Sequence, residues 1–138
     1  MNVVAPALLS FAVLPPMVEA KWGRIVNVSS GIAAHPGSMV GMNAYAAGKA
    51  ALEAHTLNLA AELDGTGVTV NAFRPGSVDT AMQSWIRDQD PEEIGAPLHE
   101  RFARSHIGGA MTTPDIAARA LLDHLGSDDT GQIWEASP

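Results

Sequence analysis

Cysteine is absent from the 138-residue sequence, and its absence removes several kinds of chemistry. Disulfide bonds, thiolate nucleophiles and cysteine-ligated zinc are excluded, and the chain is compatible with a reducing compartment. The five histidines are scattered, and "HERFARSH" does not have the H-E-x-x-H spacing of a zinc enzyme. We therefore expect no metal site, and we expect the protein to be cytoplasmic.

Basic residues are scarce. Eight lysines and arginines stand against 15 aspartates and glutamates, which gives a net charge of −7. Because no segment concentrates the lysines and arginines, the sequence lacks the basic footprint of a nucleic-acid-binding protein. Hydrophobic residues make up 46% of the chain, enough to build a core. We expect residues 1–138 to form a single globular domain.

A hydrophobic run suited to a membrane is also lacking. The apolar start "MNVVAPALLSFAVLPPM" has no basic residue before it and contains Asn2 and Pro6, which argues against an export signal. It is too short to span a bilayer comfortably. Residues 3 to 18 are apolar on nearly all sides at helical spacing, so we expect a helix that is buried on more than one side.

Strands alternate with helices along the sequence. "GRIVNVSS" and "VTVNAF" are β-rich apolar runs, whereas the stretch before "DGTG" is rich in helix-forming residues. The expected elements are helices over 3–18, 44–63 and 114–125, and strands over 24–29, over 68–73 and in "GQIWEA". This order predicts an α/β fold with a parallel sheet, in which ligands bind beyond the carboxyl ends of the strands.

Residues 77 to 112 have the least regular pattern. The turn sequences "DQDPEEIGAP" and "HIGGAMTT" surround one or two short amphipathic helices, which is more typical of a lid than of a core. The larger apolar side chains of this lid either line a substrate pocket or belong to a satellite core or a dimer surface. These residues are Met82, Trp85, Ile86, Phe102 and Met111.

Tyr45 and Lys49 are four residues apart, so a helix places their side chains on one face about one turn apart. Such pairs are common, and the pair alone leaves packing and catalysis both open. Two further features favour catalysis: a serine of "VSSG" ends the preceding strand, and Asn2 opens the helix before it.

Other catalytic motifs fit the sequence less well. "GMNAYAAGKA" lacks the spacing and hydroxyl residue of a P-loop, and "VSSG" lacks the first glycine of a hydrolase elbow.

The stretches "GRIVNVSSG", "YAAGK" and "VTVNAFRPGSVDT" resemble, in this order, the short-chain dehydrogenase/reductase superfamily over essentially the whole chain. The resemblance implies a doubly wound Rossmann-type fold and hydride transfer between NAD or NADP and an alcohol or carbonyl substrate. It implies that Tyr45 is the acid/base, that Lys49 also bonds the nicotinamide ribose, and that Asn2 holds a water in a relay to solvent. The implied catalytic residues are Asn2, Ser30, Tyr45 and Lys49, with Ser29 as the less favoured serine.

Elementary electrostatics agrees with the role that the resemblance implies for the lysine. An unperturbed tyrosine titrates near pH 10, and lowering its pKa by about three units requires roughly 4 kcal/mol. An ammonium about 6 Å from the phenolate contributes roughly 2.8 kcal/mol at an effective dielectric constant of about 20. The remainder is expected from the charge of the oxidised nicotinamide and from the Ser30 hydroxyl.

The sequence "RPGSVDT" turns the chain just after the second strand. By resemblance, Thr80 bonds the cofactor carboxamide, and Pro75 and Gly76 shape the turn. With Tyr45 and Lys49, these three residues are the expected cofactor-binding set. An ordinary turn followed by a helix cap is the alternative, and Arg74 of the same stretch has no role in this interpretation.

Family members begin with a strand, a T-G-x-x-x-G-x-G turn and a helix that receives the pyrophosphate, and this sequence contains no such turn. The N-terminal dinucleotide-binding half is therefore expected to be absent, the chain alone is expected to bind cofactor weakly, and the strand over 24–29 is expected to have an unpaired apolar edge. In the family, the helices over 3–18 and 44–63 pack across a dimer two-fold, which implies a homo-oligomer. The alternative to an oxidoreductase is a truncated, non-catalytic interaction or oligomerisation module.

Overall fold

The structure is a computed structural model, and it describes residues 1–109 and 111–136. The strands form a parallel three-stranded sheet in the order β1-β2-β3, which confirms the predicted α/β fold. The elements in chain order are α1 (Val4–Glu19), β1 (Gly23–Val28), η1 (Gly31–Ala33), η2 (Pro36–Ser38), α2 (Asn43–Glu62), β2 (Val68–Arg74), α3 (Ala81–Arg87), α4 (Pro91–Ile94), α5 (Ala96–Ile107), α6 (Pro114–Leu125) and β3 (Ile133–Glu135).

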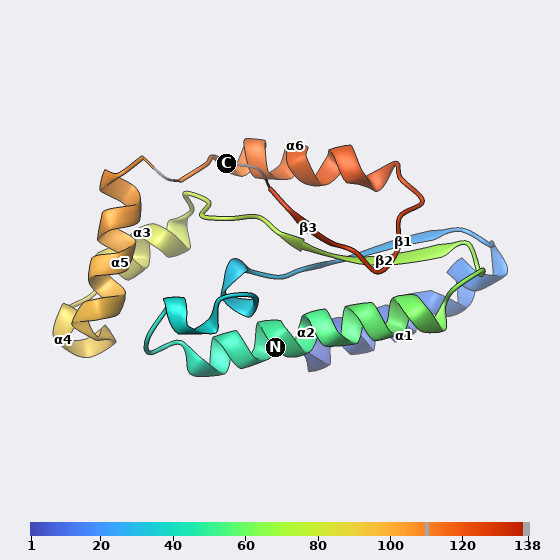
Figure 1. The fold of residues 1–138 in the computed structure, drawn as a ribbon, viewed down its shortest axis with the longest axis horizontal. Coiled ribbons are helices and arrows are strands. Elements are labelled where there is room, and N and C mark those ends of the chain that lie inside the picture. The colour runs from blue at the N-terminus through green and yellow to red at the C-terminus, as the bar shows by residue number, and fades with distance from the viewer. Residues whose placement is uncertain (110, 137–138) are drawn as a thin grey trace.

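Helices cover both faces of the sheet (Figure 1). α1 and α2 lie together along one face, and α6 lies over the other. β2 is the central strand, and all its residues before Arg74 are buried, as expected of an apolar strand in a parallel sheet. Ile25 of β1 and Val70 of β2 pack against Leu59 and Ala60 of α2 to form the core.

The connections that lead into β1 and β2 meet at the amino ends of these strands. Gly67 has a φ of 82°, and a Cβ atom at this position would overlap the backbone oxygen of Lys21. Glycine is therefore required here both for the backbone conformation and for the close approach of the two connections. The approach starts the ladder in which Gly23 pairs with Val68.

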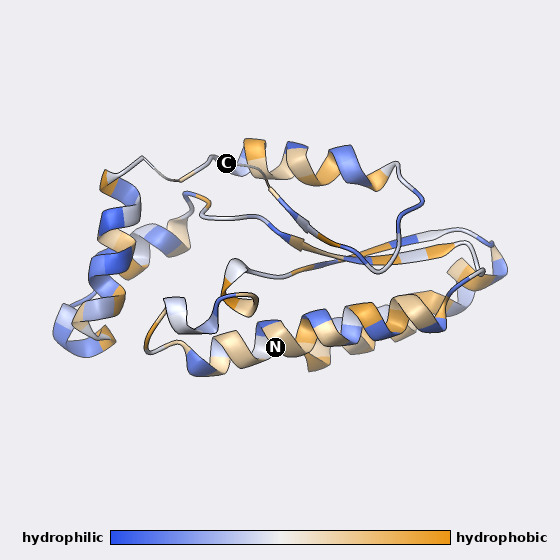
Figure 2. Cartoon of the chain, in the orientation of Figure 1, coloured by the Kyte–Doolittle hydropathy of each residue, from blue (hydrophilic) through white to orange (hydrophobic). Residues whose placement is uncertain are grey.

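The expected burial of the first helix on several sides is wrong for the residues that the structure describes. Leu14 and Met17 of α1 pack against the core, but Leu8, Leu9 and Phe11 remain largely exposed. Figure 2 shows hydrophobic residues along both α1 and α2. The reason is that α1 packs mainly on β1 and α2, which leaves its outer face uncovered. No helix in the described ranges is long and apolar enough to cross a membrane.

The region over 77–112 contains three helices, α3, α4 and α5, where the sequence predicted one or two. The additional helix is α4, in a stretch that we predicted as a turn. Its N-terminus is favoured because the Asp90 side chain accepts a hydrogen bond from the Glu92 N–H and Pro91 occupies the first turn. The three helices form a group beyond the carboxyl ends of β1 and β2 (Figure 1).

Candidate active site

A cavity of about 540 Å³ lies at the carboxyl ends of β1 and β2, between the start of α2 and the helices α3, α5 and α6. We call it the site cavity, and its volume suits a small organic ligand. Apolar side chains make most of its wall, and they include Val28, Met39, Met42, Phe73, Val78, Met82, Ile86, Phe102, Ala117 and Leu121. Its polar residues are Ser29, Ser30, Tyr45, Lys49, Ser77, Thr80 and Gln83.

Tyr45 and Lys49 occupy the first two turns of α2, and both line the site cavity. The Lys49 Nζ lies 5.7 Å from the centroid of the Tyr45 ring, so the predicted pair shares one face of the helix. The same Nζ donates a hydrogen bond to the Val28 carbonyl oxygen at 2.7 Å, which ties the lysine to the end of β1. Partial burial lowers the pKa of Lys49.

The two adjacent serines have different surroundings. Ser29 is buried, and its hydroxyl donates a hydrogen bond to Glu53 Oε1 at 2.6 Å. Ser30 is less buried and has an extended backbone, and its hydroxyl accepts from the Ile32 N–H at the start of η1. Both residues line the site cavity, but the Ser29 proton is already used inside the protein. Ser30 is therefore the serine whose hydroxyl proton remains available to a ligand.

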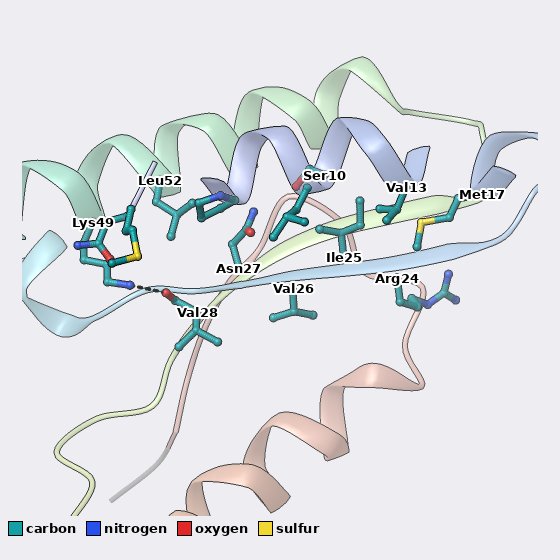
Figure 3. Close-up of a pocket in the computed structure, with 14 residues that line it drawn as sticks. Ser10, Val13, Met17, Arg24, Ile25, Val26, Asn27, Val28, Lys49 and Leu52 are labelled. Atoms are coloured by element: carbon teal, nitrogen blue, oxygen red, sulfur yellow. Dashed lines mark hydrogen bonds between the residues drawn. The ribbon is translucent and has the colours of Figure 1, made fainter. Parts of the chain in front are cut away.

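Asn2 lies outside the site cavity. It lines a second cavity of about 460 Å³ between α1 and β1, which we call the edge cavity. In Figure 3 the side chains of Ile25 and Asn27 point to the face of the sheet that α1 and α2 cover, where Asn27 donates a hydrogen bond to Thr56 of α2. The bond from Lys49 to Val28 lies at one end of the view. Lys49 lines both cavities. The structure thus brings Ser30, Tyr45 and Lys49 together at the site cavity and places Asn2 with Lys49 at the edge cavity.

Gly48 explains how Asn2 reaches this position. A Cβ atom at residue 48 would lie 3.2 Å from the Cβ of Asn2, which is tighter than an ordinary van der Waals contact. The chain before α1 therefore packs directly on the backbone of α2, one residue before Lys49.

Pro75, Gly76 and Thr80 line the site cavity beside the end of β2. Gly76 has a φ of 74°, a backbone conformation that favours glycine. The Thr80 hydroxyl caps α3 by accepting a hydrogen bond from the Gln83 N–H at 3.4 Å, so its proton remains free to be donated. The ammonium of Lys49 and the hydroxyls of Tyr45 and Thr80 thus offer donors to a ligand with hydroxyl and carboxamide oxygens.

Sequence reasoning missed the surroundings of Glu53 and Arg74. Glu53 is only 7% exposed, and its carboxylate accepts two hydrogen bonds from Arg74, from Nε and from Nη2, each at 2.8 Å. Arg74 also donates to Glu135 of β3. The sequence drew attention to each residue separately, because Glu53 extends the four-residue spacing of Tyr45 and Lys49 and Arg74 ends a strand that is otherwise uncharged, but it did not show that the two side chains meet.

The charges in this cluster are strongly stabilised. Burial works against the charged form of Glu53, but hydrogen bonds from Arg74 and Ser29 and the positive charge of Arg74 outweigh it, so the pKa of Glu53 is lowered. The hydrogen bond to Glu53 is the largest influence that raises the pKa of Arg74, and Glu135 adds to it. Both groups are therefore ionised at neutral pH.

The lid residues divide into two groups. Met82, Ile86 and Phe102 line the site cavity, although Met82 is also 62% exposed. Trp85 is largely exposed and Met111 lies near Arg87, and neither lines this cavity. The pocket role that the sequence left open is thus structurally supported for three of the five apolar residues.

The chain is similar in sequence and in fold to known proteins. The family model described as short chain dehydrogenase matches residues 1–91. The chain is 42% identical to the uncharacterized oxidoreductase YjdA of Bacillus subtilis, covering 80% of this chain and 40% of that protein. It is 47% identical to the 3-oxoacyl-acyl-carrier-protein reductase FabG of Pseudomonas aeruginosa, covering 62% of this chain and 34% of that protein.

A solved structure with the same fold is a short chain dehydrogenase from Salmonella enterica serovar Typhi. It superposes with a TM-score of 0.74 and 27% sequence identity, over 99% of this chain and 50% of that one. The superposition confirms the Rossmann-type fold that the sequence resemblance implied. The chain spans at most half the length of each of these three proteins.

Proposed function

The chain belongs to the short-chain dehydrogenase family, and from this premise we propose that it interconverts an alcohol and a carbonyl compound with a nicotinamide cofactor. The observation that carries the proposal is that Ser30, Tyr45 and Lys49 line one cavity of a size suited to a small ligand. A hydroxyl donor, a phenol and a nearby ammonium are the groups required to move a proton to or from a substrate oxygen.

Tyr45 is the proposed acid and base. In the reducing direction its hydroxyl gives a proton to the carbonyl oxygen, while the Ser30 hydroxyl donates a hydrogen bond to the same oxygen. The positive charge of Lys49, 5.7 Å from the ring centroid, stabilises the phenolate that remains. In the oxidising direction the phenolate takes the alcohol proton back.

The residues around the site cavity fit the nicotinamide end of NAD or NADP. Lys49 has three N–H groups and uses one for Val28, so two remain for a ribose hydroxyl and a water. The Thr80 hydroxyl is the proposed donor to the carboxamide, and Pro75 and Gly76 are the proposed boundary of the pocket beside it. When bound, the nicotinamide supplies or accepts the hydride at the substrate carbon.

Asn2 is proposed to serve the proton path rather than the substrate. Lys49 lines both the site cavity and the edge cavity, and Asn2 lines only the latter. A water held by the Asn2 amide beside Lys49 would connect the lysine to solvent through the edge cavity. This arrangement gives Tyr45 a route for proton exchange while substrate fills the site cavity.

The wall of the site cavity indicates the substrate class. Lys49 is the only charged residue that lines it in the described part of the chain, and most of the remaining surface is apolar. An anionic or cationic substrate would lose hydration without gaining partners beyond Lys49. We therefore propose a neutral, partly apolar carbonyl compound or alcohol as substrate.

A non-catalytic association module is the second candidate, and one observation favours it. α1 exposes an apolar face that includes Leu8 and Phe11, and the exposed Leu9 lines the edge cavity beside β1. Such a face favours contact with another protein surface, and a homo-oligomer through α1 and α2 is the form we propose. The oligomer is compatible with catalysis, whereas the non-catalytic module requires that no turnover occur.

Turnover measurements separate the two candidates. The protein, as the 138-residue chain and with any residues encoded in frame before Met1, is mixed with NADH or NADPH and a set of neutral apolar carbonyl compounds. Loss of nicotinamide absorbance that disappears in Tyr45→Phe and persists in Asp128→Asn, a change at an exposed carboxylate outside the site cavity, supports the oxidoreductase. Turnover that survives Tyr45→Phe contradicts the assignment of Tyr45, and no turnover in any form supports the second candidate.

A further inference from the structure

Four side chains form a hydrogen-bonded network next to the site cavity. Glu53 lies at its centre, where it accepts hydrogen bonds from the Ser29 hydroxyl and from two nitrogens of Arg74. Arg74 uses its remaining terminal nitrogen for Glu135. Glu53 and Arg74 do not line the cavity themselves, so they are outside the set of groups that touch a ligand. We call these four residues the Glu53 network.

Three of the four members of the network are next to a proposed site residue. Ser29 precedes Ser30, Arg74 precedes Pro75, and Glu53 lies one helical turn after Lys49 on the same face of α2. The network therefore joins the ends of β1 and β2 to the helix that carries the phenol and the ammonium. Glu135 extends it to β3, whose residue pairs with Arg74 in the sheet.

Backbone hydrogen bonds alone do not fix the position of α2 relative to the ends of β1 and β2. β1 and β2 are held by their ladder, and the Ser29 N–H continues it with a bond to the Phe73 carbonyl oxygen at 2.7 Å. α2 has no such ladder to the sheet, because its backbone hydrogen bonds are used within the helix. Polar side chains link this part of α2 to the sheet: Glu53 bonds Ser29 and Arg74, Lys49 donates to Val28, and Thr56 accepts from Asn27 of β1 at 3.0 Å. Of these links, only those of Glu53 reach the ends of both β1 and β2.

The ion pair between Arg74 and Glu53 is bidentate, so its geometry is directional. Arg74 presents two N–H groups to the two oxygens of one carboxylate, which fixes the relative orientation of both groups as a single contact cannot. Buried ion pairs of this kind are weak evidence for stability, because desolvation offsets much of their attraction. Fixing the position of α2 against the strand ends is therefore the better explanation of the pair.

We propose that Glu53 and Arg74 are positioning residues, which hold Tyr45 and Lys49 in register with Ser30 and with the Pro75-Gly76 turn. The proposal rests on the proposed oxidoreductase for the roles of the residues that are positioned. The effect of Glu53 on the position of the Tyr45 ring, two helical turns away, can be tested without measuring turnover.

Tyr45 is the only tyrosine in the sequence, so it supplies a direct test. The protein is labelled with ¹³C on the tyrosine ring, and the single set of ring resonances is compared between wild type, Glu53→Gln and Arg74→Lys. Asp128→Asn is the matched control, because it removes another arginine-carboxylate pair, the one between Asp128 and Arg24. The Asp128 side chain is 96% exposed and does not line the site cavity. We expect displaced or broadened ring resonances in Glu53→Gln and Arg74→Lys and unchanged ones in Asp128→Asn.

A double variant separates positioning from stability. Glu53→Leu combined with Arg74→Met replaces the buried pair by apolar side chains of similar length, which commonly preserves folding. A positioning role predicts a folded protein whose Tyr45 resonances remain displaced and whose kcat is lowered roughly 10- to 100-fold with a smaller change of KM. Wild-type resonances in this variant, or in Arg74→Lys, would overturn the proposal.

The two proposals fail in different ways. If wild type has no turnover but the network variants move the Tyr45 resonances, the oxidoreductase assignment is wrong and the positioning of the ring stands. If wild type turns over and the network variants keep both its kcat and its resonances, the positioning role is wrong. Partial recovery of kcat in Arg74→Lys relative to Arg74→Met supports the network, because lysine keeps the charge but loses the paired contact.

Discussion

Lys49 is held between two partners: its Nζ is 2.7 Å from the Val28 carbonyl oxygen and 5.7 Å from the centroid of the Tyr45 ring. The contact with Val28 comes from the strand, and the spacing to Tyr45 comes from one turn of α2. The ammonium is therefore located by both the sheet and the helix. A charge fixed in this way stabilises a phenolate without paying for reorganisation at the moment of proton transfer.

Replacing Lys49 by methionine is expected to lower kcat by roughly 100-fold, because the positive charge beside the Tyr45 ring and the bond to the Val28 carbonyl oxygen are both lost. Steady-state kinetics measures the effect. Lys21→Met is the control, since Lys21 is the other lysine and lies at the opposite end of the sheet. Equal kcat values for the two variants would contradict the electrostatic role.

Ser29→Ala is expected to lower mainly the stability of the protein, and Ser30→Ala is expected to lower mainly its turnover. Ser29→Ala removes a buried hydrogen bond to the Glu53 carboxylate and is expected to lower the free energy of unfolding by about 1.5 to 3 kcal/mol. Ser30→Ala removes only a long capping bond and is expected to leave stability within about 0.5 kcal/mol of wild type.

Turnover is expected to fall roughly 100-fold in Ser30→Ala, because an oxygen-stabilising donor is lost. Chemical denaturation and steady-state kinetics measure the two effects. The assignment of the two serines is reversed if the unstable variant is Ser30→Ala.

Thr80 has a capping role that must be separated from its proposed contact with the cofactor. Thr113 caps α6 in the same way, accepting from Ile116, but it does not line the site cavity. Thr80→Ala and Thr113→Ala are each expected to lose about 1 kcal/mol of stability.

Only Thr80→Ala is expected to weaken binding of NADH or NADPH, by about 10-fold, as followed by nicotinamide fluorescence. Equal affinities in the two variants would leave Thr80 with the capping role alone.

One rule about parallel sheets predicts which residues lie at the site cavity. Ser30, Tyr45 and Thr80 follow from motif spacing, because residues at the carboxyl ends of parallel strands and at the next helix start meet at one edge of the sheet. The Glu53 contact with Arg74 was not predictable, since it joins residues 21 positions apart whose side chains meet only once α2 is docked. The helix α4 was missed because "PEEI" is too short for a periodic pattern. The exposed face of α1 was missed because apolar composition does not say what covers a helix.

The Glu53 network is expected to make stability depend on pH. The folded-state pKa of Glu53 lies below its ordinary value of 4.5, so its contribution is present above that pH and is lost as pH falls through the folded pKa. Between the two values the folded state binds fewer protons than the unfolded state, and the free energy of unfolding falls by up to about 1.4 kcal/mol per pH unit for this group. Glu53→Gln removes the titration and is expected to flatten the acid limb.

The measurement is urea denaturation at a series of pH values from neutral to acidic. Glu100→Gln is the matched control, because Glu100 pairs with Arg104 on an exposed helix face and contributes little. At neutral pH, Glu53→Gln is expected to be less stable than wild type by about 3 kcal/mol, since Arg74 loses a buried partner. The two curves should converge as pH falls, because wild type then loses the same charge by protonation. Parallel curves for wild type and Glu53→Gln would show that the Glu53 charge does not contribute, and the positioning role would then depend on its shape alone.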